Sequence, residues 1–298
     1  MMKGKEQAMD GLLVFGSTGQ VARELERLCP QAVFLGRDQA DLTDPEGCAQ
    51  AIRRHAPQAV INAAAYTAVD GAESDEAVAA LVNAAAPAAM AQACAELGIP
   101  FVQISTDYVF DGQGETPFAP DHPTAPLGAY GRTKRAGEEG VMASGAVAAV
   151  LRTSWVFSAH GRNFVKTMLM LSKTRDHLTV VADQTGGPTS ARAIAHACLE
   201  IAAQLKTSPE KAGIYHFAGA PDTNWACFAR ETFAQAGRSV TVEDIPASAY
   251  PTPAVRPANS RMDCTSTARI FGISRPDWRA DLAQVLEDLE VHDAAAAQ

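Results

Sequence analysis

The sequence predicts an α/β fold in which a doubly wound parallel sheet is followed by a smaller C-terminal cap. Three observations predict this fold. Short apolar runs alternate with amphipathic stretches through the first half, a glycine-rich turn follows the first apolar run, and the alternation loosens beyond residue 154. Strands buried on both faces appear in sequence as continuous apolar runs, as parallel sheets with helices on either side require.

The elements of the first half can be assigned in order. Runs of strand length lie at residues 11–15, 32–35, 59–62 and 101–104, and the stretches between them have helical spacing over 20–28, 45–54 and 76–97. The polar, Pro- and Gly-rich residues 105–125 are predicted to form a functional loop, followed by a helix over 129–142 and a strand over 146–151.

The second half is less regular. Helices are predicted over 163–171, 191–205 and 225–236, and strands over 178–181 and 214–217. The segment 246–257 is rich in proline, which lacks an amide hydrogen, so we expect no regular structure there. The resulting organisation is a polar leader (1–10), a dinucleotide-binding core with a catalytic helix (11–154), remaining strands with a substrate-binding cap (155–291) and a frayed tail (292–298).

Composition excludes several classes of protein. Of the 298 residues, 47% are hydrophobic and 20% charged, as in soluble globular proteins. The formal net charge of −9 argues against a nucleic-acid partner, which needs a basic face. No apolar run reaches the roughly 20 residues that a membrane span needs, and the leader has no apolar stretch of a signal peptide. The six cysteines are isolated, as in reduced cytoplasmic proteins.

The glycine-rich turn indicates a dinucleotide site. Residues 16–22 read GSTGQVA and open a helix directly after the first strand. Glycines there let the backbone approach a pyrophosphate, and the helix N-terminus offers free amides and a positive dipole end. The spacing of Gly16, Gly19 and Ala22 favours the short-chain dehydrogenase branch of Rossmann folds, although a tight turn alone would also explain glycine.

The end of the second strand bears on cofactor choice. Asp38 would accept hydrogen bonds from both ribose hydroxyls and favour NAD, whereas Arg37 would pair with a 2′-phosphate and favour NADP. Neighbouring residues at a strand end point to opposite sides. We predict that Arg37 faces the ribose and that NADPH is preferred, with Arg37 as a solvated residue and NADH as the alternative.

Three residues suggest acid–base chemistry. Tyr130 and Lys134 lie four apart on a predicted helix and so project from one face, and Thr106 ends an apolar strand. A nearby ammonium lowers the pKa of a phenol, and a threonine hydroxyl could hold the substrate oxygen in line. Tyr130 and Lys134 alone could equally be surface residues of a helix. The glycine turn and the Thr106 strand end, in this order, favour catalysis.

Longer motifs give a specific resemblance. They are GSTGQVARELE from Gly16, INAAAYTAVDGAE from Ile61, STDYVFDG from Ser105, AYGRTKRAGE from Ala129, LRTSWVF from Leu151, DQTGGPTS from Asp183, YHFAG from Tyr215 and YPTPAVRPANSRMD from Tyr250. Nearly end to end, the chain resembles extended short-chain dehydrogenases, and among them the dTDP-4-dehydrorhamnose reductases. The resemblance implies NADPH-dependent reduction of dTDP-4-dehydro-L-rhamnose to dTDP-L-rhamnose, the last step in making this activated sugar.

The resemblance also implies roles for individual residues. Thr106, Tyr130 and Lys134 take the catalytic places, and Asp107 and Trp155 touch the nucleotide sugar. The cofactor site comprises Gly16, Thr18, Gly19, Gln20, Val21, Asp41, Leu42, Ala63, Ala64, Ala65 and Thr67, with Arg37 added by the argument above. From phosphate chemistry we add Arg256 and Arg261 as ligands of the dTDP diphosphate, with surface ion pairs as the alternative.

Other functions are weighed on the same residues. A 4,6-dehydratase needs a second carboxylate where Tyr108 follows Asp107. An epimerising reductase needs an added Cys and His, and no such Cys is evident beside Thr106 or in residues 155–163. A regulatory subunit like that of methionine adenosyltransferase would not need Thr106, Tyr130 and Lys134. Some relatives are described as homodimers joined through magnesium between carboxylates. Glu24 is present for that role, but Arg192 stands where a second carboxylate is expected, so we predict no metal.

Overall fold

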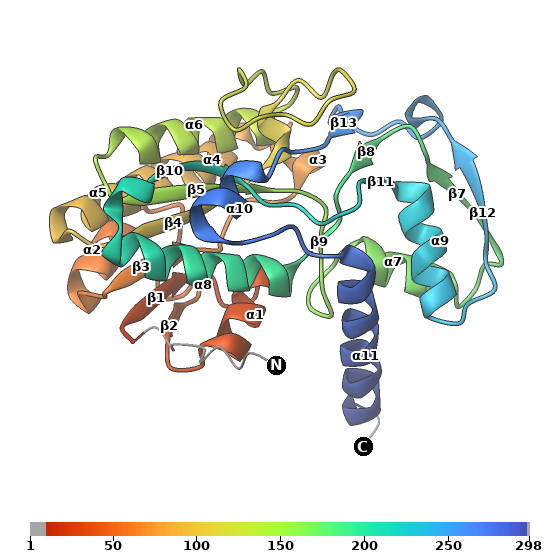
Figure 1. The fold of residues 1–298 in the computed structure, drawn as a ribbon, viewed down its shortest axis with the longest axis horizontal. Coiled ribbons are helices and arrows are strands. Elements are labelled where there is room, and N and C mark those ends of the chain that lie inside the picture. The colour runs from red at the N-terminus through yellow and green to blue at the C-terminus, as the bar shows by residue number, and fades with distance from the viewer. Residues whose placement is uncertain (1–9, 297–298) are drawn as a thin grey trace.

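Within residues 10–296, which the computed structural model describes, six strands form one parallel sheet (Figure 1). Side chains are described for residues 10–290. The strand order across the sheet is β10-β5-β4-β3-β1-β2. The bounds are β1 Leu12–Phe15, β2 Val33–Leu35, β3 Ala59–Asn62, β4 Phe101–Thr106, β5 Ala148–Thr153 and β10 Gly213–His216. The predicted parallel α/β fold is confirmed. The predicted polar leader lies almost entirely outside the described residues.

Helices cover both faces of this sheet. One face carries α1 (Gln20–Leu28) and α8 (Ala191–Thr207), and the other carries α2 (Pro45–His55), α5 (Ala86–Leu97) and α6 (Ala129–Ala143). Alternate side chains of a strand point to opposite faces. Leu12 and Val14 therefore belong to the first core and Leu13 and Phe15 to the second, and all four are buried. This is why β1 appears in sequence as an unbroken apolar run.

The direction of chain progress across the sheet reverses at β1. The chain runs from β1 outward to β2 and then crosses back to β3, which pairs with β1 on its other side. In doubly wound sheets the ligand crevice lies outside the carboxyl ends of the strands at such a reversal. The residues that follow Phe15 and Asn62 are therefore placed to line a binding site.

The helix predicted over 76–97 contains a π-helical turn. It consists of α4 (Glu76–Ala80), the π turn Leu81–Ala85 and α5. Within the turn, the Asn83 side chain accepts a hydrogen bond from the Tyr66 amide (2.9 Å) and donates to the Tyr66 carbonyl (3.1 Å) and to Thr133 Oγ1 (3.2 Å). Turns of this kind recur at functional sites. Here the turn joins the loop after β3 to helix α6.

The same helical stretch, Glu76–Leu97, is the one in the described residues that is long and apolar enough to cross a membrane by length and composition alone. In the fold, Met90, Ala91 and Cys94 on α5 are fully buried in the core beneath the sheet. Helix α5 also packs against α2 and α6. The stretch therefore forms a core helix of the sheet's second face.

A smaller body extends from the sheet beyond residue 155 (Figure 1). It contains α7 (Phe164–Leu171), α9 (Trp225–Gln235) and the paired strands β7 (His177–Val181) and β12 (Thr241–Ile245). A small sheet joins it, with the strand order β11 (Thr223–Asn224), β8 (Thr185–Gly186) and β13 (Asn259–Ser260), and β6 (Val156–Phe157) pairs with β9 (Thr189–Ser190). The strand predicted over 178–181 thus pairs inside this body, while β10 joins the central sheet.

Two helices near the C-terminus were not predicted. They are α10 (Thr265–Phe271) and α11 (Trp278–Ala296), and α11 projects from the body in Figure 1. Trp278 at the start of α11 is buried against the Phe228 ring of α9. The tail expected from residue 292 differs from the structure, because the helix continues to Ala296.

An ion-pair network fastens α11 to the sheet helices. The Arg192 guanidinium on α8 contacts Glu24 of α1 (3.4 Å) and Asp288 of α11 (2.7 Å). Arg27 also pairs with Asp288 (2.9 Å), and His160 lies 3.5 Å from Glu24. Because Glu24 is buried, the Arg192 guanidinium compensates the loss of water around its carboxylate. The network joins three helices that are far apart in sequence.

Candidate active site

A cavity of about 720 Å³ lies at the carboxyl ends of β1, β3, β4 and β5. It brings together the three predicted catalytic residues, Thr106, Tyr130 and Lys134. The other predicted residues that line it are Gly16, Thr18, Gly19, Gln20, Val21, Ala63, Ala64, Ala65, Thr67, Asp107 and Trp155. Residues from four separate strand ends therefore converge on one space, as expected at the reversal of the sheet.

The glycine turn is shaped for an anionic ligand. Gly16 has a φ of 103°, which side-chain-bearing residues rarely adopt, and its amide bonds to the Leu35 carbonyl of β2 (2.9 Å). Helix α1 begins after Gly19 with neither a side-chain cap nor an acidic residue in its first turn among the described residues. Its first amides and the positive end of its dipole therefore face the cavity. These features fit a dinucleotide pyrophosphate.

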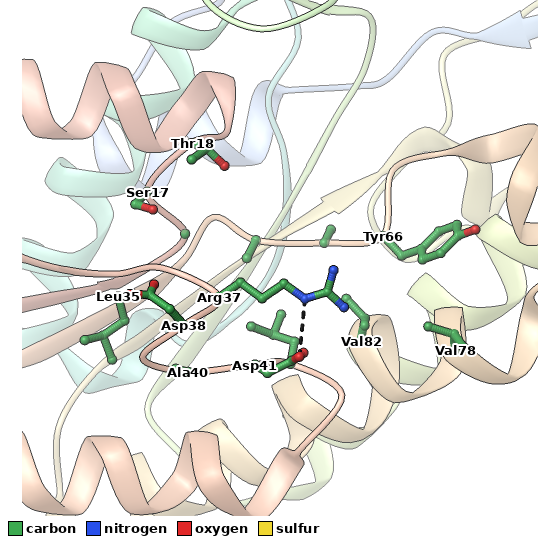
Figure 2. Close-up of a pocket in the computed structure, with 14 residues that line it drawn as sticks. Ser17, Thr18, Leu35, Arg37, Asp38, Ala40, Asp41, Tyr66, Val78 and Val82 are labelled. Atoms are coloured by element: carbon green, nitrogen blue, oxygen red, sulfur yellow. Dashed lines mark hydrogen bonds and ion pairs between the residues drawn. The ribbon is translucent and has the colours of Figure 1, made fainter.

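A second cavity of about 550 Å³ adjoins the first and shares Gly16, Thr18, Ala64 and Ala65 with it (Figure 2). Arg37, Asp41 and Leu42, which are predicted from the sequence to bind the cofactor, line this second cavity together with Asp38. Figure 2 shows the Arg37 side chain reaching toward Asp41, and Nε lies 3.3 Å from Asp41 Oδ2. Hydrogen bonds from Thr43 lower the pKa of Asp41. The carboxylate therefore stays ionised near neutral pH and can pair with the Arg37 guanidinium.

Helix α6 places Tyr130 and Lys134 beside the end of β4. The Glu73 carboxylate accepts a hydrogen bond from the Ala129 amide (2.8 Å) and so caps the helix. At Gly131, an added methyl group would collide with the Tyr108 carbonyl oxygen. Glycine at this position therefore lets the first turn of α6 lie directly against the chain that follows Thr106.

The ionisation of the pair differs from the sequence-based expectation. Lys134 was expected to lower the pKa of Tyr130, but Lys134 Nζ donates to the Ile104 carbonyl (2.7 Å) and desolvation raises the pKa of Tyr130, with the Thr106 hydroxyl opposing the rise. Burial lowers the pKa of Lys134 to about 8, against the opposing field of Glu138. Tyr130 is therefore a neutral phenol that keeps its proton near neutral pH, as a proton donor must.

Asp107 lies where the sheet meets the smaller body. Its Oδ1 accepts a hydrogen bond from Thr106 Oγ1 (3.0 Å). Burial raises the pKa of Asp107 to about 6, and the hydroxyls of Ser260 and Thr106 oppose the rise. Ser260 belongs to β13 of the smaller body. A carboxyl group that can change charge near neutral pH thus lies next to the predicted catalytic threonine.

Trp155 forms a wall of the cavity in an unusual conformation. Its φ of 49° is rare for a residue with a bulky side chain and carries a cost in backbone strain. The ring stacks on Trp225 of α9, with centroids 3.6 Å apart and planes 13° from parallel. A methyl group at Gly186 would approach the same ring to 2.8 Å. Packing against Trp225 of α9 and Gly186 of β8 therefore holds Trp155 against the site.

The two arginines predicted to bind diphosphate lie outside the described lining of both cavities. Arg256 pairs with Asp70 (2.9 Å) and donates to the Tyr108 hydroxyl (3.2 Å), and Tyr108 does line the larger cavity. Arg261 Nε donates to Asn259 Oδ1 (2.8 Å). Arg256 therefore contacts a residue that lines the cavity, Tyr108, but does not line the cavity itself. Arg261 is hydrogen-bonded to Asn259, two residues away in sequence.

Comparison with known proteins identifies the family of this chain. The family model described as RmlD substrate binding domain matches residues 9–291. A dTDP-4-dehydrorhamnose reductase of Sinorhizobium fredii is 44% identical over 90% of this chain and 93% of its own length. The chain belongs to the dTDP-4-dehydrorhamnose reductase family. A probable dTDP-4,6-dihydroxy-2-methyloxan-3-one 4-ketoreductase of Streptomyces antibioticus is 39% identical over 93% of this chain and 95% of its own length.

A solved structure supports the family fold. The dTDP-4-dehydrorhamnose reductase of Bacillus anthracis, in complex with NADP, superposes with a TM-score of 0.86 at 30% sequence identity. The superposition covers 93% of this chain and 98% of that one. The nearly complete coverage of both chains means that the smaller body, like the sheet, is a shared family feature.

Some lining residues of this reductase-family site were not predicted. Tyr66, Val78 and Val82 line the smaller cavity, and Tyr108 and Arg162 line the larger one. Val78 and Val82 have the spacing of one helix face, which in sequence is indistinguishable from core packing. The crossover that carries α4 past the strand ends brings them to the cavity, and a single sequence gives no signal of that placement.

No metal site is evident in the part of the chain with described side chains. There, no group of three or more His, Cys, Asp or Glu residues could hold an ion. At the position where the family resemblance places a metal, the Glu24 carboxylate contacts the Arg192 guanidinium instead. A fixed cation therefore does the charge compensation that a divalent ion would otherwise provide.

Proposed function

We propose that this protein reduces the C4 keto group of dTDP-4-dehydro-L-rhamnose with NADPH, giving dTDP-L-rhamnose for the synthesis of cell-surface polysaccharides. One observation carries the proposal. Thr106, Tyr130 and Lys134 line one cavity with the glycine turn, in a chain 44% identical to a dTDP-4-dehydrorhamnose reductase over 90% of its length. The family resemblance supplies the substrate, and the cavity supplies groups suited to the reaction.

The chemistry follows from the state of each side chain. When bound, the nicotinamide cofactor supplies a hydride to C4 of the sugar. Tyr130 donates its proton to the oxygen that becomes the hydroxyl, and its raised pKa keeps that proton available. Thr106 donates a hydrogen bond to the same oxygen as charge builds on it. We assign Lys134 to the nicotinamide ribose, in addition to its hydrogen bond to the Ile104 carbonyl.

The cofactor site is assigned to both cavities. The uncapped start of α1 and the small side chains after β3 fit a dinucleotide that crosses the end of β1. The residues assigned to it are Gly16, Thr18, Gly19, Gln20, Val21, Arg37, Asp41, Leu42, Ala63, Ala64, Ala65, Thr67, Tyr130 and Lys134. Ala63 to Ala65 leave room where larger side chains would fill the space beneath the ligand.

Arg37 is assigned to the 2′-phosphate of NADPH. Its side chain is 79% exposed and is held over the smaller cavity by Asp41. Asp38 lines the same cavity, and its carboxylate lies beside the backbone of Gly36: a methyl group added at Gly36 would be 2.7 Å from Asp38 Oδ1. A carboxylate there would favour NADH, so the two neighbours compete for the ribose. The relative crystallised with NADP supports the assignment to Arg37.

The sugar nucleotide is assigned to the side of the larger cavity that faces the smaller body. Asp107 and Trp155 lie there, and Arg256 reaches the cavity through Tyr108. We assign residues 11–154 to cofactor binding and catalysis, and 155–291 to the remaining strand and the substrate cap. We assign Arg256 and Arg261 of the cap segment to the diphosphate, because the planar guanidinium group suits phosphate oxygens.

The setting of the reaction follows from its reactants. Nucleotide sugars and NADPH are cytoplasmic metabolites, so we place the protein in the cytoplasm, without a nucleic-acid or membrane partner. A second copy of the chain is the proposed protein partner. The net charge of −9 is unsuited to nucleic-acid backbones.

A coupled assay tests the proposed function. The keto sugar is generated from dTDP-glucose by the preceding dehydratase and epimerase, and NADPH oxidation is followed on addition of this protein. We expect NADPH consumption equal to the dTDP-rhamnose formed, with NADH used less efficiently. The Arg37→Ala variant should lose NADPH efficiency and retain that with NADH. Absence of turnover with this sugar, or turnover only with a different dTDP-4-keto sugar, would refute the substrate assignment.

A further inference from the structure

The loop of residues 158–163 is fastened to the first residue of α1. It connects β6 to α7 and contains the side chains of Ser158, His160, Arg162 and Asn163. Ser158 Oγ and Asn163 Nδ2 both donate to Gln20 Oε1, at 2.9 and 3.0 Å. These contacts hold the loop against the end of the glycine turn.

Further contacts make the loop rigid around Arg162. The Asn163 side chain also donates to the carbonyls of Ser158 (2.8 Å) and His160 (3.2 Å), and it caps α7 through the Lys166 amide (3.1 Å). Lys166 Nζ turns back to the Ala159 carbonyl (2.9 Å). The backbone on both sides of Arg162 is therefore fixed by hydrogen bonds.

Arg162 is the charged side chain of this loop for which the described residues provide no polar partner. It is exposed, and no hydrogen bond or ion pair to it occurs among the residues with described side chains. Its neighbours His160 and Lys166 contact Glu24 and the Ala159 carbonyl. Arg162 lines the larger cavity together with Gly19, Gln20 and Gly161. Its guanidinium is thus available to a ligand in that cavity.

The surroundings of Arg162 favour the binding of an anion. The start of α1 places a positive dipole end and free amides at the same wall of the cavity, without an acidic residue in the first turn. Two positive features on one wall repel each other unless an anion lies between them. Arginine offers a planar donor pair that matches two phosphate oxygens.

We propose that Arg162 binds the pyrophosphate of the nicotinamide dinucleotide, from the loop that faces the start of α1. This inference rests on the proposed function, which supplies the dinucleotide. The diphosphate of the sugar nucleotide is the other anion of the same chemistry. We favour the dinucleotide because Arg162 shares its wall with Gly19 and Gln20, whereas Arg256 lies toward the cap.

Direct binding measurements test the proposal without turnover. Titrations of wild type and Arg162→Ala with NADPH, ADP-ribose and 2′-AMP separate the parts of the cofactor, because 2′-AMP lacks the pyrophosphate. A lost hydrogen-bonded cation should raise the Kd for NADPH and ADP-ribose by about 10-fold or more and leave that for 2′-AMP unchanged. The NADPH affinity of the variant should also depend less steeply on salt.

Two further variants serve as controls. Arg162→Lys should recover part of the affinity, since it keeps the charge but loses the planar donor pair. Arg175→Ala makes the same change of charge at an exposed arginine outside the lining of both cavities, so it should leave every Kd unchanged.

The outcomes are distinguishable. An unchanged Kd for NADPH and ADP-ribose in Arg162→Ala overturns the proposal. A raised KM for the sugar nucleotide with unchanged NADPH binding also overturns it, and assigns Arg162 to the substrate diphosphate. Failure of the wild type to bind NADPH refutes the proposed function itself, and this inference with it, before any variant is compared.

Discussion

Tyr130 shows how a single residue of this site obtains its chemistry from its surroundings. Its spacing from Lys134 predicts a shared helix face, and the structure places both in one cavity. The sequence cannot reveal desolvation, which here outweighs any effect of Lys134 and raises the pKa of the phenol. Likewise, the carbonyl of Ile104 as the partner of Lys134 depends on where β4 ends. The sequence thus predicts which residues share the site, whereas their protonation states depend on the fold.

Replacement of Tyr130 by phenylalanine should abolish the proton donor and spare the cofactor site. We expect turnover to fall by about 100-fold or more, the usual scale of a lost general acid, with the Kd for NADPH little changed. Steady-state kinetics and NADPH titration provide the two readouts. Tyr215→Phe is a matched control, because the Tyr215 hydroxyl bonds to the Lys211 carbonyl (2.6 Å) outside the site. Near-normal turnover in Tyr130→Phe would assign the proton to another group.

At the scale of elements, the sheet was more predictable than the smaller body. The strands β1, β3 and β5 contain continuous apolar runs, because both of their faces are buried. In contrast, β8, β9, β11 and β13 are two residues long and are stabilised by neighbours distant in sequence. Helix α11 was not predicted, although Trp278, Leu282, Val285, Leu286 and Leu289 have helical spacing and pack together in the core of the smaller body. The two-residue strands β8, β9, β11 and β13 carry too few residues for a periodic signal.

The proline-rich segment 246–257 gives a prediction at this scale. Its Arg256 pairs with Asp70 and bonds to Tyr108, so the segment connects the cap to the cavity wall. Arg256→Ala should raise the KM for the sugar nucleotide by about 10-fold, since one charge-assisted contact is lost, without a change in the Kd for NADPH. Arg261→Ala is the comparison, with a smaller effect expected because Arg261 is bound to Asn259. An unchanged KM in Arg256→Ala would remove this segment from substrate binding.

For the whole molecule, the Glu24–Arg192–Asp288 network is the main polar connection between the sheet helices and α11. Glu24 is 1% exposed, so removal of its cation leaves a buried charge poorly compensated. Arg192→Leu should lower the free energy of unfolding by about 1–3 kcal/mol, seen as a lower midpoint in urea. Arg23→Leu breaks a pair whose side chains are about half exposed and should change stability by less than about 1 kcal/mol. Equal effects of the two variants would contradict the role of the network.

Metal removal is the second test at the molecular scale. Because Arg192 lies where the family resemblance places a second carboxylate, we expect EDTA to leave the Tm and the sedimentation coefficient unchanged. Added magnesium should likewise have no effect on either quantity. A lower Tm or a smaller particle in EDTA, reversed by magnesium, would show that an ion does join two copies of the chain.

The position of α8 and β10 in the chain has a consequence for biosynthesis. The ribosome makes the first five strands before either element, yet α8 covers Val102, Ala149 and Leu151, and β10 closes the edge of β5. A nascent chain that ends near residue 190 therefore exposes an apolar sheet face and an unpaired strand, both of which favour aggregation. The cofactor-binding half can therefore be completed only after α8 and β10 have been synthesised. A gene fragment that encodes only that half should accordingly give insoluble protein.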